Sequence, residues 1–149
     1  EVLKDILVGE VWMCSGQSNM EWAMAWGAVD NKAKEIKDAN YPLIRFINSP
    51  HVVSGTPCAN IKAGWRVCSP KTVGHFSAVG YFFGRDLFQK LDVPIGLIGA
   101  NWGGTRVEPW TPPSGFEAVP TLKRIAQDIK KHDEQYRKDL KAAIPAIKA

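Results

Sequence analysis

An apolar run that ends in a serine-containing turn constrains the fold of this chain more than any other feature of its sequence. Residues 6–13 (ILVGEVWM) have the β-branched and aromatic content of a buried strand, and residues 19–24 begin a stretch compatible with a helix. Between them lies Gly16-Gln17-Ser18-Asn19-Met20, which places Ser18 at a strand-to-helix turn where backbone N–H groups converge. The spacing matches only part of the G-x-S-x-G nucleophile turn of hydrolases. On this segment alone, an ordinary polar turn is the simpler interpretation.

A second apolar run ends in a turn of a similar kind. Residues 94–100 (PIGLIGA) predict another buried strand, and Asn101-Trp102-Gly103-Gly104 follows it directly. Two adjacent glycines allow the backbone to approach a ligand closely or to adopt a positive φ. The N–H groups of such a turn can stabilise the oxyanion that develops during acyl transfer. A tight loop, with glycines for turn geometry and tryptophans for packing, is the alternative.

The segments between these two turns predict an alternating α/β order. Residues 30–39 favour a helix, residues 43–47 a strand, residues 48–75 a long loop, and Ser77 is a plausible N-cap for a helix through Leu91. The order strand, helix, strand, helix, strand is typical of a parallel sheet covered on both faces. Ligands bind such sheets at the carboxyl ends of the strands, which is where both turns are expected.

Three ordered blocks carry a resemblance to a known family. They are GEVWMCSGQSNME at residues 9–21, FSAVGYFFGR and VPIGLI at residues 76–85 and 93–98, and NWGGT at residues 101–105, the last followed by Glu108 and Trp110. Together they resemble the sialate O-acetylesterase family within the SGNH (GDSL-like) hydrolase superfamily, over residues 5–113. The resemblance implies a three-layer α/β fold with a parallel sheet, incomplete at its C-terminal end.

The resemblance also implies a chemistry, namely hydrolysis of O-acetyl esters of sialic acid, with acetylated xylan or another polysaccharide as the alternative substrate. It makes Ser18 the nucleophile that carries an acetyl-enzyme intermediate, and it makes the N–H groups of Ser18, Gly103 and Gly104 the oxyanion donors. This mechanism requires neither a metal nor a cofactor. The polar residues expected to orient Ser18 or to contact substrate are Gln17, Asn19, Asn101, Thr105 and Arg106. Turn stabilisation for Gln17 and Asn19, and an ion pair with Glu108 for Arg106, are the alternative roles.

The general base of such a mechanism is missing from the sequence. A serine hydroxyl needs a base, usually a histidine oriented by a carboxylate, and the family carries both in a D-x-x-H block. Asp128-Ile129-Lys130-Lys131-His132 has one residue too many, and the family's W-Y-Q-G-E-like block is absent as well. No sequence feature indicates that His51, His75 or His132 lies beside Ser18. We therefore expect a C-terminal portion of the same domain to complete the site. A catalytically inactive fragment or a carbohydrate-binding relic is the alternative.

Composition and charge exclude other classes of function. The net charge of +4 arises largely after residue 122, where lysines and arginines alternate with acids, which is typical of a solvated helix face rather than a nucleic-acid site. Residues 120–144 predict an amphipathic helix that ends at Pro145 and resembles the start of a helical insertion in the family. No apolar stretch has the length of a membrane span, and no G-x-G-x-x-G or G-K-[ST] pattern supports a nucleotide site. Cys58 and Cys68 allow a disulfide in a secreted protein, and the resemblance favours an extracellular, periplasmic or lysosomal location.

Overall fold

The computed structural model describes residues 2–54 and 57–148, with side chains described as far as residue 144. The chain divides into two compact units. One comprises residues 1–51 and 60–105, and the other comprises residues 52–59 and 106–149.

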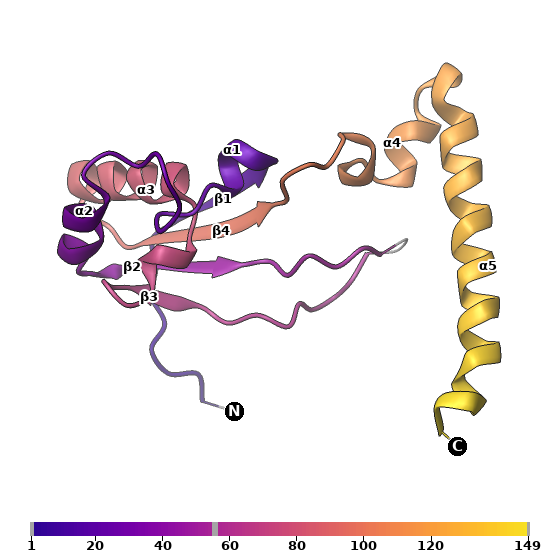
Figure 1. The fold of residues 1–149 in the computed structure, drawn as a ribbon, viewed down its shortest axis with the longest axis horizontal. Coiled ribbons are helices and arrows are strands. Elements are labelled where there is room, and N and C mark those ends of the chain that lie inside the picture. Colours follow the sequence, from indigo (N-terminus) through magenta and orange to yellow (C-terminus); the bar gives the residue numbers. More distant parts are fainter. Residues whose placement is uncertain (1, 55–56, 149) are drawn as a thin grey trace. The chain divides into compact units, whose positions relative to one another are not determined.

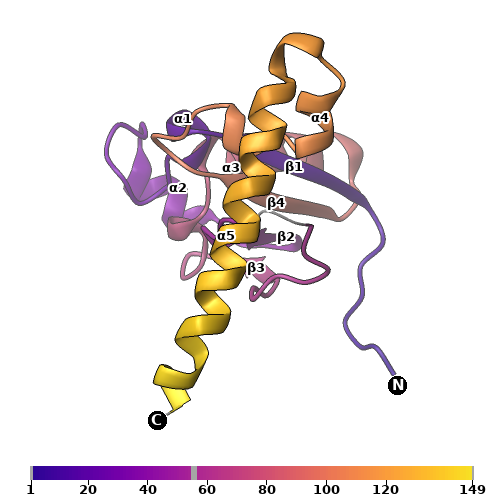
Figure 2. The same cartoon turned by 90° about the vertical axis from the view of Figure 1, so that its right-hand side faces the viewer.

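The first unit is built on a four-stranded sheet. Its strands are β1 (Glu10–Gly16), β2 (Tyr41–Asn48), β3 (Arg66–Cys68) and β4 (Ile95–Asn101), in the order β1-β4-β2-β3. β4 pairs in parallel with β1 and with β2, whereas β3 runs antiparallel to β2. The carboxyl ends of the parallel strands point in the same direction (Figure 1), and the view from these ends shows the four strands in this order (Figure 2). The mixed α/β class expected from the sequence is confirmed.

Helices cover one face of this sheet. The short α1 (Ser18–Glu21), α2 (Lys32–Asp38) and α3 (Ala78–Leu91) lie on the same side of the sheet, together with the 3-10 turn η1 (Val73–His75) (Figure 1). Arg85 of α3 forms an ion pair with Glu35 of α2. The N-cap expected at Ser77 is confirmed, because its Oγ accepts the N–H of Gly80 at 3.0 Å. Phe46 stacks on Phe76 in the core beneath these helices.

The opposite face of the sheet carries no helix among the described residues of the first unit. Val11 and Met13 of β1 are 62% and 67% exposed there. The sequence predicts a sheet covered on both faces and a buried first strand. The structure differs, because β1 is an edge strand and Cys14 is its one buried residue. The strand also begins at Glu10 rather than at residue 6, since its partner β4 begins at Ile95 and offers nothing earlier to pair with.

The region predicted as one long loop, residues 48–75, contains β3 and η1. A strand of three residues has almost no periodicity of its own, and β3 forms because Arg66 and Val67 pair with Phe46 and Arg45 of β2. Cys68, at the end of β3, is fully buried, and this burial raises the pKa of its thiol to about 11. Among the described residues no bond joins Cys68 to Cys58, whose thiol donates to the Ser54 hydroxyl at 3.4 Å.

The second unit is helical. It holds the 3-10 turns η2 (Glu108–Trp110) and η3 (Pro120–Leu122), and the helices α4 (Pro113–Glu117) and α5 (Lys123–Lys148). Phe116 and Ala126 are buried between α4 and α5, whereas Tyr136 and Leu140 on the apolar stripe of α5 are exposed. The backbone of α5 continues past Pro145, where the sequence predicts its end. No helix in the described part of the chain has the length and apolarity that crossing a membrane requires.

Candidate active site

The serine turn forms at the carboxyl end of β1. Gly16 closes the strand with φ +148°, a backbone conformation that L side chains rarely adopt. The carbonyl of Gln17 then accepts the N–H groups of Met20 and Glu21 at 3.0 and 2.9 Å, which winds the chain into α1. Ser18 is the first residue of that helix and is exposed. A residue in the first turn has no acceptor within its helix for its N–H, so the Ser18 amide is open to an external oxygen.

The second predicted turn lies directly against the first. The N–H of Trp102 donates to the carbonyl of Gly16 at 3.0 Å, and Nδ2 of Asn101 donates to the carbonyl of Cys14 at 3.1 Å. A Cβ added at Gly103 would lie 3.3 Å from the Ser18 hydroxyl oxygen. The structure therefore brings the two segments together at the carboxyl ends of β1 and β4.

Glu21 enters this site although the sequence does not predict it. Its Oε2 accepts the N–H of Gly103 at 2.5 Å. The amide of Gly103 is thus occupied by a carboxylate oxygen, close to the nucleophile. Gly104 has φ +75°, has open space where a Cβ would point, and donates its N–H to no group of the described residues. Of the two glycines, Gly104 has the available donor in this structure.

His51 is the second residue that sequence reasoning missed. It follows β2, and its Nε2 lies 3.0 Å from the carbonyl oxygen of Asn101 and 3.3 Å from Oε1 of Glu21. Both neighbours are hydrogen-bond acceptors, so Nε2 carries a proton. The ring stacks on Trp102 with a centroid separation of 4.3 Å and an interplanar angle of 6°. The sequence feature that could have pointed to His51 is its position after a predicted strand, because loops at the carboxyl ends of parallel strands lie close together.

No histidine of the described residues hydrogen-bonds to the Ser18 hydroxyl. His51 reaches the site through Glu21, His75 contributes its backbone carbonyl to Nδ2 of Asn48 at 2.9 Å, and His132 lies on α5 in the second unit. The described residues also hold no group of three His, Cys, Asp or Glu side chains suited to a metal ion. Among the described residues, therefore, no histidine is placed to act as the general base for Ser18.

The remaining predicted residues have mostly structural contacts. Asn101 ties β4 to β1 through its bond to Cys14, and Thr105 Oγ1 donates to the carbonyl of Trp102 at 2.7 Å, which closes the glycine loop. Gln17 acts through its backbone, and Asn19 is exposed beside Ser18. Arg106 belongs to the second unit, so its contact with substrate stays a prediction.

Known proteins are similar to this chain in sequence and in fold. A family model described as carbohydrate esterase, sialic acid-specific acetylesterase, matches residues 8–145. The sialate O-acetylesterase of Mus musculus is 36% identical over 116 residues, covering 72% of this chain and 21% of the mouse protein. The human sialate O-acetylesterase is 33% identical over 135 residues, covering 83% of this chain and 25% of the human protein.

The crystal structure of a carbohydrate acetylesterase from Xanthomonas citri superposes with a TM-score of 0.67 at 34% identity, covering 71% of this chain and 24% of that one. The chain thus spans 21% and 25% of the mouse and human relatives' lengths. The resemblance stated from the three sequence blocks is confirmed. By the match over residues 8–145 and these relatives, the chain belongs to the carbohydrate esterase family of sialic acid-specific acetylesterases.

Proposed function

We propose that the protein hydrolyses O-acetyl esters of sugars, sialic acid foremost, with Ser18 as the nucleophile. One observation carries this proposal: an exposed serine at a strand-to-helix turn lies against a glycine loop, where a Cβ added at Gly103 would be 3.3 Å from the serine hydroxyl. Two neighbouring strand ends thus supply a nucleophile and amide donors to one point in space. The names of the mouse and human relatives support sialic acid as the acetylated sugar.

The reaction is acyl transfer in two steps. Ser18 Oγ attacks the acetyl carbonyl carbon, the ester C–O bond breaks, and the sugar leaves as an alcohol after taking up a proton. Water then attacks the acetyl-serine, releases acetate and restores the hydroxyl. In this proposal the N–H groups of Ser18 and Gly104 stabilise the oxyanion, and Gly103 becomes a further donor when the Glu21 carboxylate moves off its amide.

The base that activates Ser18 comes, in our proposal, from a further portion of the same domain. The outer edge of β1 pairs with no strand of the described residues, and the helix-free face beside it exposes Val11 and Met13. An unpaired, apolar edge strand is a surface that another element normally covers. A segment packed there would lie beside the serine turn, where it can present a histidine and its carboxylate. In the same proposal, α5 begins a helical insertion that precedes this segment.

Two esters and one variant test the proposal. Release of nitrophenol from p-nitrophenyl acetate, and of acetate from O-acetylated sialic acid, is measured for the chain, for a longer form extended to include the D-x-x-H block that the family resemblance implies, and for Ser18→Ala of each. Turnover in the longer form that disappears in Ser18→Ala supports the proposal. Turnover that survives Ser18→Ala contradicts it.

A non-catalytic carbohydrate-binding role is the second candidate. The absence, among the described residues, of a histidine hydrogen-bonded to Ser18 favours it for the chain alone. Sugar binding without turnover in both the chain and the longer form would support this role. Acetylated xylan, tested beside O-acetylated sialic acid, separates the two substrate classes.

A further inference from the structure

A polar cavity of about 470 Å³ opens beside β2 and β3 in the first unit. Its lining comes from the last residues of β2, from the segment that leads into β3, and from η1: Phe46, Asn48, Lys62, Ala63, Gly64, Arg66, Thr72 and His75. The volume is in the range of cavities that hold small ligands. The cavity has no part in the serine and glycine turns described above.

The charge of this cavity is positive and is not neutralised. Lys62 and Arg66 line it, His75 adds a third basic side chain, and no aspartate or glutamate is among its lining residues. Neither cation forms an ion pair or a side-chain hydrogen bond with any described residue. By contrast, Arg45 and Arg85 in the same unit pair with Asp5 and Glu35. Two unpaired cations at one concave site raise the local concentration of anions.

The neutral polar groups of the cavity are already engaged. Nδ2 of Asn48 donates to the carbonyl of His75 at 2.9 Å, and Oγ1 of Thr72 donates to the carbonyl of Val67 at 2.6 Å. The charged donors left for a ligand are the ammonium of Lys62 and the guanidinium of Arg66, with the imidazole of His75 beside them. A guanidinium binds a carboxylate through two parallel hydrogen bonds, and an ammonium adds a point charge.

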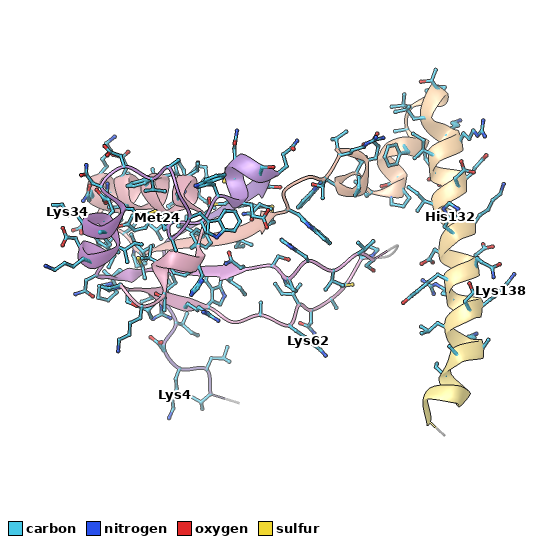
Figure 3. All side chains as sticks on the ribbon, viewed as in Figure 1. Lys4, Met24, Lys34, Lys62, His132 and Lys138 are labelled. Carbon is cyan, nitrogen blue, oxygen red and sulfur yellow. The ribbon has the colours of Figure 1, made fainter. Side chains whose placement is uncertain are left out.

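The cavity lies at the carboxyl ends of the parallel strands, as the nucleophile does. Asn48 ends β2 and is in register with Gly99, while Gly16, just before the serine turn, is in register with Asn101. β2 and β1 are separated by β4, so their ends are about 10 Å apart at the usual spacing of strands. Figure 3 shows Lys62 on the side of the sheet toward which the parallel strands point. A sugar with an extended side chain can span that distance.

We propose that this cavity binds the carboxylate of an acidic sugar, with Lys62 and Arg66 as the residues that select it over a neutral sugar. The inference rests on the proposed esterase function and deepens it, because it decides between sialic acid and acetylated xylan. Sialic acids carry a carboxylate at one end and a hydroxylated side chain at the other. Such a substrate would place its carboxylate in the cavity and an acetylated hydroxyl at Ser18.

Direct binding tests this assignment without the need for turnover. N-acetylneuraminic acid and its uncharged methyl ester are titrated into the chain, and binding is followed by amide chemical shifts and by calorimetry. We expect the acid to bind about tenfold more tightly than the ester, because a charge-assisted hydrogen bond is lost with the charge. The shifts should be largest at Asn48 and at Gly64–Arg66.

Matched variants locate the charge that matters. Lys62→Gln with Arg66→Gln should remove the preference for the acid, and Lys71→Gln, an exposed lysine outside the cavity lining, should retain it. Equal binding of acid and ester by the wild type would overturn the inference, as would a preference that survives the double substitution. Acetate or phosphate binding as tightly as the sugar acid would also overturn it, since the cavity would then be a simple anion site.

The outcome is separable from that of the proposed function. p-Nitrophenyl acetate carries no carboxylate for the cavity to bind, so its hydrolysis by the longer form tests the esterase mechanism separately from acid binding by the double variant. A selective loss of sugar-acid binding in that variant supports the cavity assignment. Retained hydrolysis in Ser18→Ala would contradict the esterase mechanism and leave the binding result intact.

Discussion

At the scale of single residues, Glu21 connects more of the candidate site than any residue predicted from the sequence. One carboxylate oxygen accepts the Gly103 amide at 2.5 Å, and the other lies 3.3 Å from Nε2 of His51. His51 in turn contacts Asn101 and stacks on Trp102. Glu21 therefore fixes the glycine loop against the helix that begins with Ser18.

We expect Glu21→Ala to loosen the glycine loop. Loss of a charge-assisted acceptor should speed amide hydrogen exchange at Gly103 by about tenfold or more, while Glu21→Gln, which retains an acceptor oxygen, should change it much less. The exchange is measured by NMR, with Glu134→Ala on α5 as a matched control. Unchanged protection of the Gly103 amide in Glu21→Ala would contradict this role.

Gly103→Ala should impair hydrolysis through crowding. The added methyl group would lie 2.7 Å from the Glu21 carboxylate and 3.3 Å from the Ser18 hydroxyl, so the carboxylate must move and the nucleophile loses space. We expect a fall of at least about tenfold in kcat/KM for p-nitrophenyl acetate in the longer form, with the fold retained by circular dichroism. Activity equal to wild type would show that the loop lies farther from Ser18 during catalysis.

At the scale of elements, α3 packs closely on the sheet because two of its glycines, one helical turn apart, face the strands. A Cβ at Gly80 would lie 2.9 Å from Cys14 Sγ, and one at Gly84 would lie 2.7 Å from a methyl carbon of Leu97. These glycines give up helix propensity, which costs about 1 kcal/mol each, in exchange for close approach of the helix to β1 and β4. The approach packs α3 directly on the two strands whose carboxyl ends carry the site.

Gly84→Ala should therefore destabilise the protein despite the better helix propensity of alanine. Overpacking against the fully buried Leu97 costs about 1–3 kcal/mol, which exceeds the gain in propensity of about 1 kcal/mol. Urea unfolding followed by tryptophan fluorescence measures the difference. Gly27→Ala, where nothing lies within 4 Å of the added atom, is the matched control and should be close to neutral. A stabilised Gly84→Ala would mean that α3 has room to shift.

At the scale of the whole molecule, three buried acids set the alkaline limit of stability, and burial raises the pKa of each, the Cys14 thiol included. Burial raises the pKa of Cys68 from 9.0 to about 11 and that of Tyr81 from 10.0 to about 12, against an opposing effect of Arg85 on Tyr81. Between the unfolded and folded pKa values the unfolded chain binds fewer protons than the folded chain. Stability is thus fully present below pH 9 and falls as the pH rises toward 12.

Unfolding free energies measured from pH 7 to pH 11 test this window. Cys68 and Tyr81 should each remove on the order of 2 kcal/mol once the pH has passed the folded pKa, so the loss begins near pH 9 with the Cys68 thiol. In Cys68→Ala the decline should be shallower, because Cys14 and Tyr81 alone of these acids remain to titrate. A flat profile up to pH 11 in the wild type would contradict the assignment.

Much of the fold was predictable because local patterns encode it. The helix over α3 and its cap at Ser77 follow from apolar spacing and from side-chain hydrogen bonding within the segment. The cores of β2 and β4 follow from their apolar residues. The limits of β1 and the existence of β3 could not be predicted, because each depends on the extent of a partner strand distant in sequence.

The sequence by itself determined the family, the α/β class, the serine turn and the glycine loop, since each is written in a contiguous block of residues. Only the tertiary structure showed the two turns in direct contact, added Glu21 and His51 to them, and gathered Lys62 and Arg66 at one cavity. Those contacts join residues from different strands and loops, and their free energy exists only once the chain has folded. A single polar residue in a loop carries no local signal of the partner it will meet.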